Sequence, residues 1–528
     1  MKSDRYDAIV IGAGHNGLVT AGYLAKAGLK VAVFEKRNLV GGCAVTEEPW
    51  DGFKVSSLSY VNSLFRPEIV QDLHLKDFGF EMIPRIPSSF TPFIDGRSLL
   101  LGPDKNKNIE EISKFSKKDA ANYPKFEAML DEMSDILEPL MTMIPPNPGK
   151  LNFNDIWNYG SYLFKNKPSL QKNWAELTRM MTGSAMDMLD EWFESEELKV
   201  TLATDAVIGA NASPSMPGTA YVLFHHVMGE CNGVRGVWGY MRGGMGGLTQ
   251  SLAKSCESLG VQIFVDNGIT KITTKNGSAT GVITENGNDY KSRIVVSGAD
   301  CNVTFLKLLD TSELPEEFIR DVRRINYDSA SVKINLATDT LPDFNAKPGV
   351  GEWLNGTIHI CPNLQYIEDA YSDSVAGRPS KSPILEMTIP SKLDNTLAPH
   401  GKYVINLFTQ YGPYKLREGL TWEAERDRYA DRAIEILCEY APNMKNAILH
   451  KQVLTPLDLE REYSLTGGSL FHGRMTLDQM FNMRPVPGYA NYRTPISKLY
   501  LCGSATHPGG GVMGTSGLNA SKEILKDW

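Results

Sequence analysis

The sequence predicts an α/β fold in which a parallel sheet covered by helices is assembled from separate segments and interrupted by an inserted α+β domain. Three observations lead to this prediction. Glycine-rich stretches follow short apolar runs near both ends of the 528-residue chain, a similar arrangement lies mid-chain, and long stretches of mixed character separate the three. A chain of this length is too long for one ordinary core, so two intertwined domains are expected.

The first segment joins an apolar run to glycines and then to a helix. Residues 8–11 can form a buried strand, Gly12, Gly14 and Gly17 follow in the spacing G-x-G-x-x-G, and residues 18–26 have the pattern of a helix. The glycines permit a tight turn and a close approach of backbone to a pyrophosphate, and the helix N-terminus favours negative charge. This arrangement predicts a Rossmann-like dinucleotide site.

An acidic residue ends the second apolar run. Residues 30–34 lead into Glu35, whose carboxylate can accept hydrogen bonds from both ribose hydroxyls and disfavours a 2′-phosphate, which argues against NADP. The glycine pair that follows lets the chain pass close beside the cofactor. Further cofactor contacts are expected from Lys36, Arg37, Gly41 and Gly42.

A second glycine-rich segment near the C-terminus suggests which dinucleotide binds. A strand at 499–502 is followed by glycines and then by a helix at 515–525, which gives a second helix N-terminus. One anion site near each chain end suits FAD, with the diphosphate at the first and the flavin at the second. The alternative is two ordinary glycine loops with NAD at the first. The expected flavin contacts are Gly503, Ser504, Gly511, Val512 and Met513.

The middle of the chain, 239–299, supplies the rest of the cofactor-binding domain. A helix ending at Ser258 precedes strands at 261–265, 269–273 and 294–299, and Asn-Gly pairs mark hairpin turns between them. We therefore expect an FAD-binding domain made of residues 1–62, 232–308 and 488–528, and a substrate domain made of residues 63–231 and 309–487.

The two parts of the predicted substrate domain differ in character. The first is helical, as at 123–143, and rich in methionine, which suits either core packing or a lipophilic tunnel with a membrane-facing mouth. The second mixes strands with one long helix. Its strands are expected at 332–337, 384–389 and 403–410, and its helix at 422–440.

Composition excludes several functions. The net charge of -8 argues against a nucleic-acid partner, and no apolar run is long enough to span a membrane. The first strand begins so early that no room is left for a signal or transit peptide, which predicts a cytoplasmic protein.

The seven cysteines contain no C-x-x-C pair, so neither a disulfide reductase nor a metal site is expected. Adjacent His225 and His226 point in different directions and are not expected to chelate together.

The motifs resemble a known superfamily. The G-x-G-x-x-G segment with Glu35 and Gly41-Gly42 is similar to flavin-dependent amine oxidases and phytoene (carotenoid) desaturases, and Thr506-His507-Pro508-Gly509-x-Gly511-Val512 resembles the terminal flavin motif of bacterial carotenoid desaturases. The resemblance implies an FAD-binding domain of the glutathione-reductase type, with backbone near Ile269 beside the adenine. It also leaves the mitochondrial matrix as an alternative location.

Two departures from amine oxidases are visible. Val512 and Met513 stand where that family places an aromatic ring of its amine cage, and no cysteine stands where covalently flavinylated members carry theirs. FAD is therefore expected to bind non-covalently. Ser504 departs from the general flavoprotein pattern, because an acidic residue often contacts the ribityl chain at that position.

The resemblance also suggests residues for catalysis. Lys333 resembles the lysine that holds a water at flavin N5, the alternative being an exposed residue at a strand edge. His507, inside the terminal motif, is expected near the ring, where it orients the flavin, moves protons or only shapes the loop.

These inferences predict an oxidoreductase that oxidises a largely apolar small molecule by hydride transfer to flavin N5, with oxygen or a quinone as electron acceptor. Two alternatives stay open: a flavin-assisted isomerase without net redox change, and a flavin-stabilised regulatory protein without turnover. A peripheral membrane contact and the oligomeric state are also left open.

Overall fold

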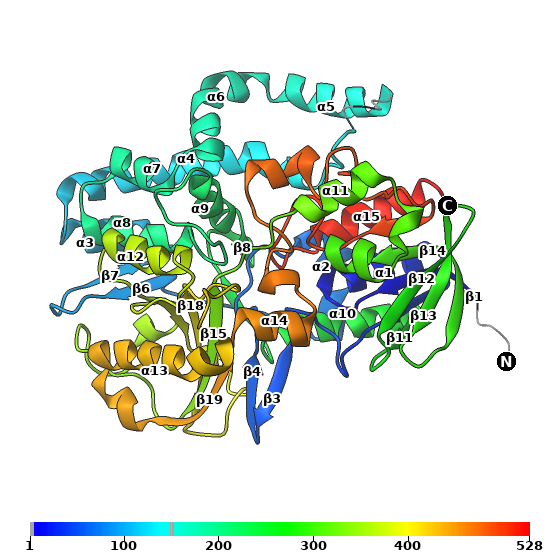
Figure 1. Ribbon diagram of the computed structural model, residues 1–528. Coiled ribbons are helices and arrows are strands. Elements are labelled where there is room, and N and C mark those ends of the chain that lie inside the picture. Colours follow the sequence, from blue (N-terminus) through cyan, green and yellow to red (C-terminus); the bar gives the residue numbers. More distant parts are fainter. Residues whose placement is uncertain (1–4, 148, 150–152) are drawn as a thin grey trace.

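Two sheets of seven strands each, flanked by helices, form the framework of the protein (Figure 1). The structure is a computed structural model that describes residues 5–147, 149 and 153–528. Among these residues no helix is both long and apolar enough to cross a membrane.

The first sheet collects strands from both ends and the middle of the chain. β1 (Arg5–Ile11) lies between β2 (Val31–Phe34) and β14 (Asp289–Ser297), and all three run parallel. The outer neighbours β11 (Gln262–Phe264) and β20 (Leu499–Leu501) are also parallel. An antiparallel hairpin, β12 (Ile269–Lys275) and β13 (Ser278–Thr284), extends the sheet beyond β14, with Asn276-Gly277 at its turn. Every predicted strand of this region is present, with bounds differing by a few residues.

Three helices cover one face of this sheet: α1 (His15–Lys26), α10 (Gly246–Ser258) and α15 (Thr515–Leu525). Val10, Leu18, Leu252 and Leu518 share one apolar core there. α1 begins earlier than predicted, so that Gly17 lies within its first turn. A side chain at Gly17 would place a Cβ 2.1 Å from the carbonyl oxygen of Gly12, which explains the third glycine of the motif.

The second sheet is mainly antiparallel and has the order β19–β15–β18–β17–β16–β6–β7. One of its faces packs against α13 (Trp422–Tyr440), whose predicted bounds are confirmed. The opposite face looks toward the first sheet. In the order given, the strands are β19 (Ile448–Leu454), β15 (Ser331–Thr338), β18 (Tyr403–Gln410), β17 (Ile384–Thr388), β16 (Thr357–Ile360), β6 (Ser89–Pro92) and β7 (Ser98–Leu101).

A group of helices covers the end of the second sheet and shares an apolar core with it. The longest is α4 (Lys117–Met141), and α5 (Phe153–Lys165) and α6 (Lys167–Thr182) extend from it across the top of the molecule in Figure 1. The others are α3 (Lys105–Ser113), α7 (Ala185–Trp192), α8 (Glu196–Asp205), α9 (Thr219–Val227) and α12 (Leu364–Val375).

Short elements connect the two halves. They are β3 (Thr46–Trp50), β4 (Phe53–Ser56), β5 (Met82–Pro84), β8 (Glu230–Cys231), β9 (Val234–Arg235), β10 (Gly239–Met241), α2 (Pro67–Asp72), α11 (Glu316–Arg324) and α14 (Pro456–Tyr463).

Two connecting helices lie with the first sheet although they belong to ranges expected in the substrate domain. Ile69 of α2 packs in the same core as α1, and Phe318 of α11 packs on the opposite face of that sheet. Both positions are apolar in sequence, and periodicity does not indicate which sheet an apolar side chain will meet.

Candidate cofactor and substrate site

A continuous cavity of about 850 Å³ runs from the first sheet to the second. Its "glycine end" is lined by Gly12, Gly14, Gly17, Glu35, Gly42, Gly503, Ser504 and Gly511. Its "sheet end" is lined by Tyr60, Arg85, Asp205, His359, Glu386 and Phe408. Segments near the two chain ends, predicted to act on one ligand, therefore meet in one space.

Backbone groups dominate the glycine end. The N-cap residue of α1 is Gly14, which has no side chain to cap the helix, so amides of its first turn have no partner within the helix. The chain returns at Gly42, where an added Cβ would come within 3.2 Å of the Gly14 Cα. A helix N-terminus with open amides and a closely packed glycine pair forms a site for an anionic group.

Glu35 is oriented by backbone on both sides. Its Oε2 accepts a hydrogen bond from the Ala13 amide at 2.8 Å, and its Oε1 accepts one from the Arg37 amide at 2.9 Å. Because each carboxylate oxygen has a second lone pair, both remain able to accept from the two hydroxyls of a ribose.

The two basic residues after Glu35 both line the cavity. Arg37 pairs with Glu47 at 2.6 Å and stacks over the Tyr463 ring, with 4.3 Å between guanidinium carbon and ring centroid. Its buried Nη1 has no hydrogen-bond partner. Arg37 is thus held in place by two side-chain contacts and still has a donor available.

The C-terminal glycine segment closes the glycine end from the other side. Ser504 Oγ accepts a hydrogen bond from the Asn16 side chain at 3.2 Å, which ties the two segments together. His225 Nε2 lies 3.2 Å from the carbonyl oxygen of Gly510. Burial lowers the pKa of His225 to about 3, so this imidazole is neutral and donates to that carbonyl.

Arg484 supports the C-terminal segment from behind. Its side chain is 2% exposed and donates hydrogen bonds to backbone carbonyls only, including two to Ser504 at 3.1 and 2.7 Å. The other acceptors are the carbonyls of Arg474, Gln479 and Phe471. Burial lowers the pKa of Arg484 to about 10, which still leaves it charged at neutral pH. No motif in the sequence indicates this role.

One row of side chains forms the sheet end. Strand register places Lys333 of β15 opposite Phe408 of β18, Phe408 opposite Glu386 of β17, and Glu386 opposite His359 of β16. Side chains directly opposite one another project from the same face of a sheet. The residues that alternate with this row along each strand, such as Val332, project from the opposite face into the core shared with α13.

Hydrogen bonds link this row to the groups around it. Tyr60 donates to Glu386 Oε1 at 2.6 Å, and Thr204 is 2.9 Å from His359 Nδ1. Arg85 donates to the Thr357 hydroxyl. The sheet end therefore carries several ionisable groups in an enclosed space, where the predicted substrate site was expected to be mainly apolar.

Burial shifts the protonation of these groups. Burial and the nearby Glu386 raise the pKa of Asp205 to about 7, and burial raises the pKa of Glu386. Burial, with a further effect of Arg85, lowers the pKa of His359 to about 3. Two carboxyl groups with raised pKa values and a neutral imidazole are consistent with proton transfer near neutral pH.

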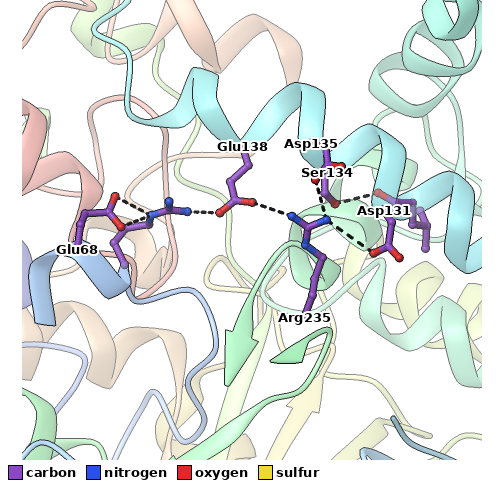
Figure 2. A network of polar contacts seen from close by, with 8 residues as sticks. Glu68, Asp131, Ser134, Asp135, Glu138 and Arg235 are labelled. Carbon is purple, nitrogen blue, oxygen red and sulfur yellow. Dashed lines mark hydrogen bonds and ion pairs between the residues drawn. The ribbon is translucent and has the colours of Figure 1, made fainter. Parts of the chain in front are cut away.

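A charged network lies where the cavity approaches the surface. Figure 2 shows Arg235 of β9 directed at carboxylates of α4. Its guanidinium is 2.9 Å from Asp135 and 3.4 Å from Glu138, and Glu138 also accepts from Arg66. Arg235 and neighbouring Val234 line the cavity, and Val234 is 48% exposed. The β8–β9 hairpin is thus fastened to α4 beside the cavity mouth.

Most predicted cofactor contacts line the cavity. The set comprises Gly12, Gly14, Gly17, Glu35, Lys36, Arg37, Gly42, Ile269, Gly503, Ser504, Gly511 and Val512. Gly41 and Met513 are predicted contacts that do not line it. Gly41 packs against Ala44, and Met513 is buried in the core shared with α4.

The two predicted catalytic residues also lie outside the lining. Lys333 is 2% exposed in an interior strand, which excludes the strand-edge alternative, and its Nζ donates to Asn335 at 2.9 Å. Tyr60 separates it from the cavity by lying 4.7 Å beneath the ammonium. His507 Nε2 is 3.0 Å from the Leu140 carbonyl. The motif around His507 gave its place in the chain but not the direction of its ring.

Other histidines line the cavity instead: His15, His225, His226, His359 and His472. The sequence marked His225 and His226 as a pair, and both are buried, with ring centroids 5.9 Å apart. All seven cysteines are in the described part of the chain and are free.

Comparisons with known proteins agree with this architecture. The family described as flavin containing amine oxidoreductase matches residues 114–525, and a NAD(P)-binding Rossmann-like domain matches residues 10–73. Pyridine nucleotide-disulfide oxidoreductase domain-containing protein 2 of Rattus norvegicus is 43% identical over 99% of this chain and 94% of its own. The chloroplastic prolycopene isomerase of Daucus carota is 26% identical over 100% of this chain and 81% of its own.

Solved structures share the fold. An oxidoreductase from Methanosarcina mazei superimposes with a TM-score of 0.60 at 17% identity, covering 99% of this chain and 100% of its own. Cyclohexylamine oxidase from Brevibacterium oxydans superimposes with a TM-score of 0.55 at 14% identity, covering 99% of this chain and 98% of its own. The predicted fold class and superfamily are both confirmed.

Proposed function

Because the chain belongs to the flavin-containing amine oxidoreductase family, we propose that it binds FAD non-covalently and dehydrogenates a small molecule with an apolar body and at least one polar group. The observation that carries the proposal is the single cavity joining both glycine segments to the sheet end. Oxygen or a quinone is the proposed electron acceptor.

The residues of the glycine end fit such a cofactor. Open amides of α1 and the unpartnered Nη1 of Arg37 are donors for a diphosphate, and Glu35 is oriented to accept from a ribose. At Gly12 and Gly14 no atom outside the adjacent residues lies within 4 Å of the position that a Cβ would take, so the backbone leaves room there for close approach of the cofactor. A bound flavin supplies a hydride acceptor, and the rest of the chemistry falls to side chains.

The sheet end supports a substrate that is not wholly apolar. Leu64, Leu130 and Phe408 offer apolar contact, whereas Arg85, Asp205 and Glu386 face the same cavity. Covering these groups with hydrocarbon alone would desolvate them without compensation, at a cost of several kcal/mol. A hydroxyl, carbonyl or similar group on the substrate would restore hydrogen bonds there.

Dehydrogenation removes a hydride from one carbon and a proton from its neighbour, leaving a double bond. Glu386 and Asp205 are the proposed proton acceptors, because both line the cavity and both have pKa values raised toward neutrality. Tyr60 donates to Glu386 and orients it.

Anaerobic reduction of the purified flavoprotein tests this proposal. We expect FAD to be released intact on denaturation, and polyene or acyl compounds bearing a polar group to bleach the flavin faster than simple alkylamines. Glu386→Gln should slow bleaching and flatten its pH profile, with FAD content unchanged. Faster bleaching by alkylamines would refute the substrate class, and substrate conversion without bleaching would support an isomerase instead.

A further inference from the structure

An apolar stripe on α5 faces solvent. Phe153, Trp157 and Phe164 are 77%, 66% and 81% exposed, and with Gly160 they follow the i, i+4, i+7, i+11 spacing of one helical face. In Figure 1 this helix runs along the top of the molecule, away from both sheets. The protein's own core therefore does not account for these aromatic side chains.

The opposite face of α5 is what attaches it to the body. Tyr159 donates to the Ile144 carbonyl at 3.3 Å, and Tyr162 donates to the Ile136 carbonyl near the end of α4. These hydrogen bonds hold one face of α5 on the body of the protein and leave the aromatic stripe exposed. An exposed apolar stripe of this kind is typical of a surface that binds another molecule or a membrane.

α6 continues the same surface. Leu163, Lys167, Leu170, Gln171 and Trp174 line a shallow depression where the two helices meet. Trp174 is exposed, and Lys167 lines the same depression. A lysine can place its stem on apolar surface and its ammonium in a polar layer.

Charge identifies the partner. Residues 153–182, which we name the arm, contain four basic and two acidic residues, a net charge of +2 in a chain whose net charge is -8. Lys172 pairs with Glu132, and Arg179 pairs with Glu176 and Glu191.

Lys165 and Lys167 flank the apolar stripe, are exposed, and form no ion pair with the described residues. Tryptophan and phenylalanine beside unpaired lysines are typical of helices that lie in the interface of an anionic bilayer, whereas lysine is depleted in protein–protein interfaces.

We propose that the arm docks on anionic lipid bilayers, with Phe153, Trp157 and Phe164 entering the interfacial layer and Lys165 and Lys167 meeting lipid phosphates. No membrane-spanning helix is needed for this attachment. No residue of the arm lines the cavity, so this proposal does not depend on the proposed reaction.

Sedimentation with vesicles tests the proposal on the full-length, cofactor-loaded protein. We compare phosphatidylcholine vesicles with vesicles containing about one-third phosphatidylglycerol. The wild-type protein should bind the anionic vesicles and be released by high salt. The triple variant Phe153→Ser/Trp157→Ser/Phe164→Ser should bind at least about tenfold more weakly. Lys165→Glu/Lys167→Glu should lower binding to anionic vesicles only.

The matched control is Val350→Ser/Val375→Ser, which removes two exposed apolar side chains elsewhere and should bind as the wild type does. Unfolding curves verify that each variant is folded. Absence of binding by the wild type, or equal binding by the triple variant, would overturn the proposal. So would a wild-type dimer in light scattering that the triple variant dissociates without any vesicle binding, because the arm would then join two copies of the chain.

Discussion

At the glycine end of the cavity, contacts come mostly from backbone amides and one carboxylate that follow each other closely in the chain. At the sheet end, three strands each contribute one side chain, and Tyr60, Arg85 and Asp205 come from three further segments. The glycine end therefore depends on local turns and helix termini, whereas the sheet end depends on strand register. Changes at the two ends should have correspondingly different effects.

Loss of Arg484 should have the largest effect, because it supports the glycine end from outside the local sequence. Arg484→Met leaves several carbonyls buried without a donor, including that of Ser504. We expect the free energy of unfolding to fall by about 3–5 kcal/mol and FAD to be lost, measured by denaturant unfolding and flavin absorbance. Arg474→Met, which breaks an exposed ion pair with Asp328, should cost no more than about 1 kcal/mol. Equal effects of the two changes would contradict this role.

Asp205 tests the electrostatics of the sheet end. Its pKa is raised to about 7 in the folded protein, whereas an unfolded aspartate titrates near pH 4. The folded state therefore holds a proton that the unfolded state has lost, so Asp205 makes stability fall as pH rises from about 4 to about 7.

Replacement of this aspartate removes that dependence. Asp205→Asn should match the wild type near pH 4 and exceed its free energy of unfolding by about 4 kcal/mol near pH 8. The buried histidines make the opposite contribution, since they increase the free energy of unfolding as pH rises. Both proteins contain them, so their contribution drops out of the difference between the two. A difference that is constant with pH would show that Asp205 is ionised throughout.

Glu35 tests the glycine end itself. Glu35→Gln removes a charge-assisted acceptor and turns an amide NH₂ toward a backbone N–H, so the affinity for FAD should fall about 10- to 150-fold, or about 1.5–3 kcal/mol. Fluorescence titration of the apoprotein measures it. Glu48→Gln is the control, because Glu48 is exposed and caps the Gly52 amide. Unchanged affinity at Glu35 would place the ribose elsewhere.

Lys333 should have the smallest effect. Burial holds its pKa well below the ordinary value, and Tyr60 lies between it and the cavity. Burial disfavours its charged form and Tyr60 shields it from the cavity, so we expect it to supply little of the roughly 3 kcal/mol that a preorganised cation gives to a developing anion. Lys333→Met should retain FAD and change flavin reoxidation by oxygen less than about threefold in stopped-flow traces. A much larger decrease in the rate of flavin reoxidation would support the role that the resemblance suggests, in which the lysine holds a water at flavin N5.

The glycine end was predictable because its chemistry is local. The spacing of Gly12, Gly14 and Gly17, followed by Glu35, specifies a strand, a turn, a helix and an acceptor within one short stretch. Only fine placement differed, as for Gly41, which packs against Ala44 and does not line the cavity.

The sheet end was not predictable because no local pattern encodes it. Glu386, His359 and Phe408 are far apart in the chain and meet only through the register of three strands. His507 and Lys333 show the reverse case: both sit in informative motifs, yet packing turns His507 toward α4 and covers Lys333 with Tyr60.

The sequence by itself determined the fold class, the superfamily and the glycine-rich turns, since backbone turns and apolar periodicity are properties of neighbouring residues. Tertiary structure alone decided that Arg484 supports the C-terminal segment, that ionisable side chains line the sheet end of the cavity, and that the aromatic stripe of α5 faces solvent. Each of these depends on which distant surfaces pack together, and burial sets the protonation of a side chain only once that packing is known.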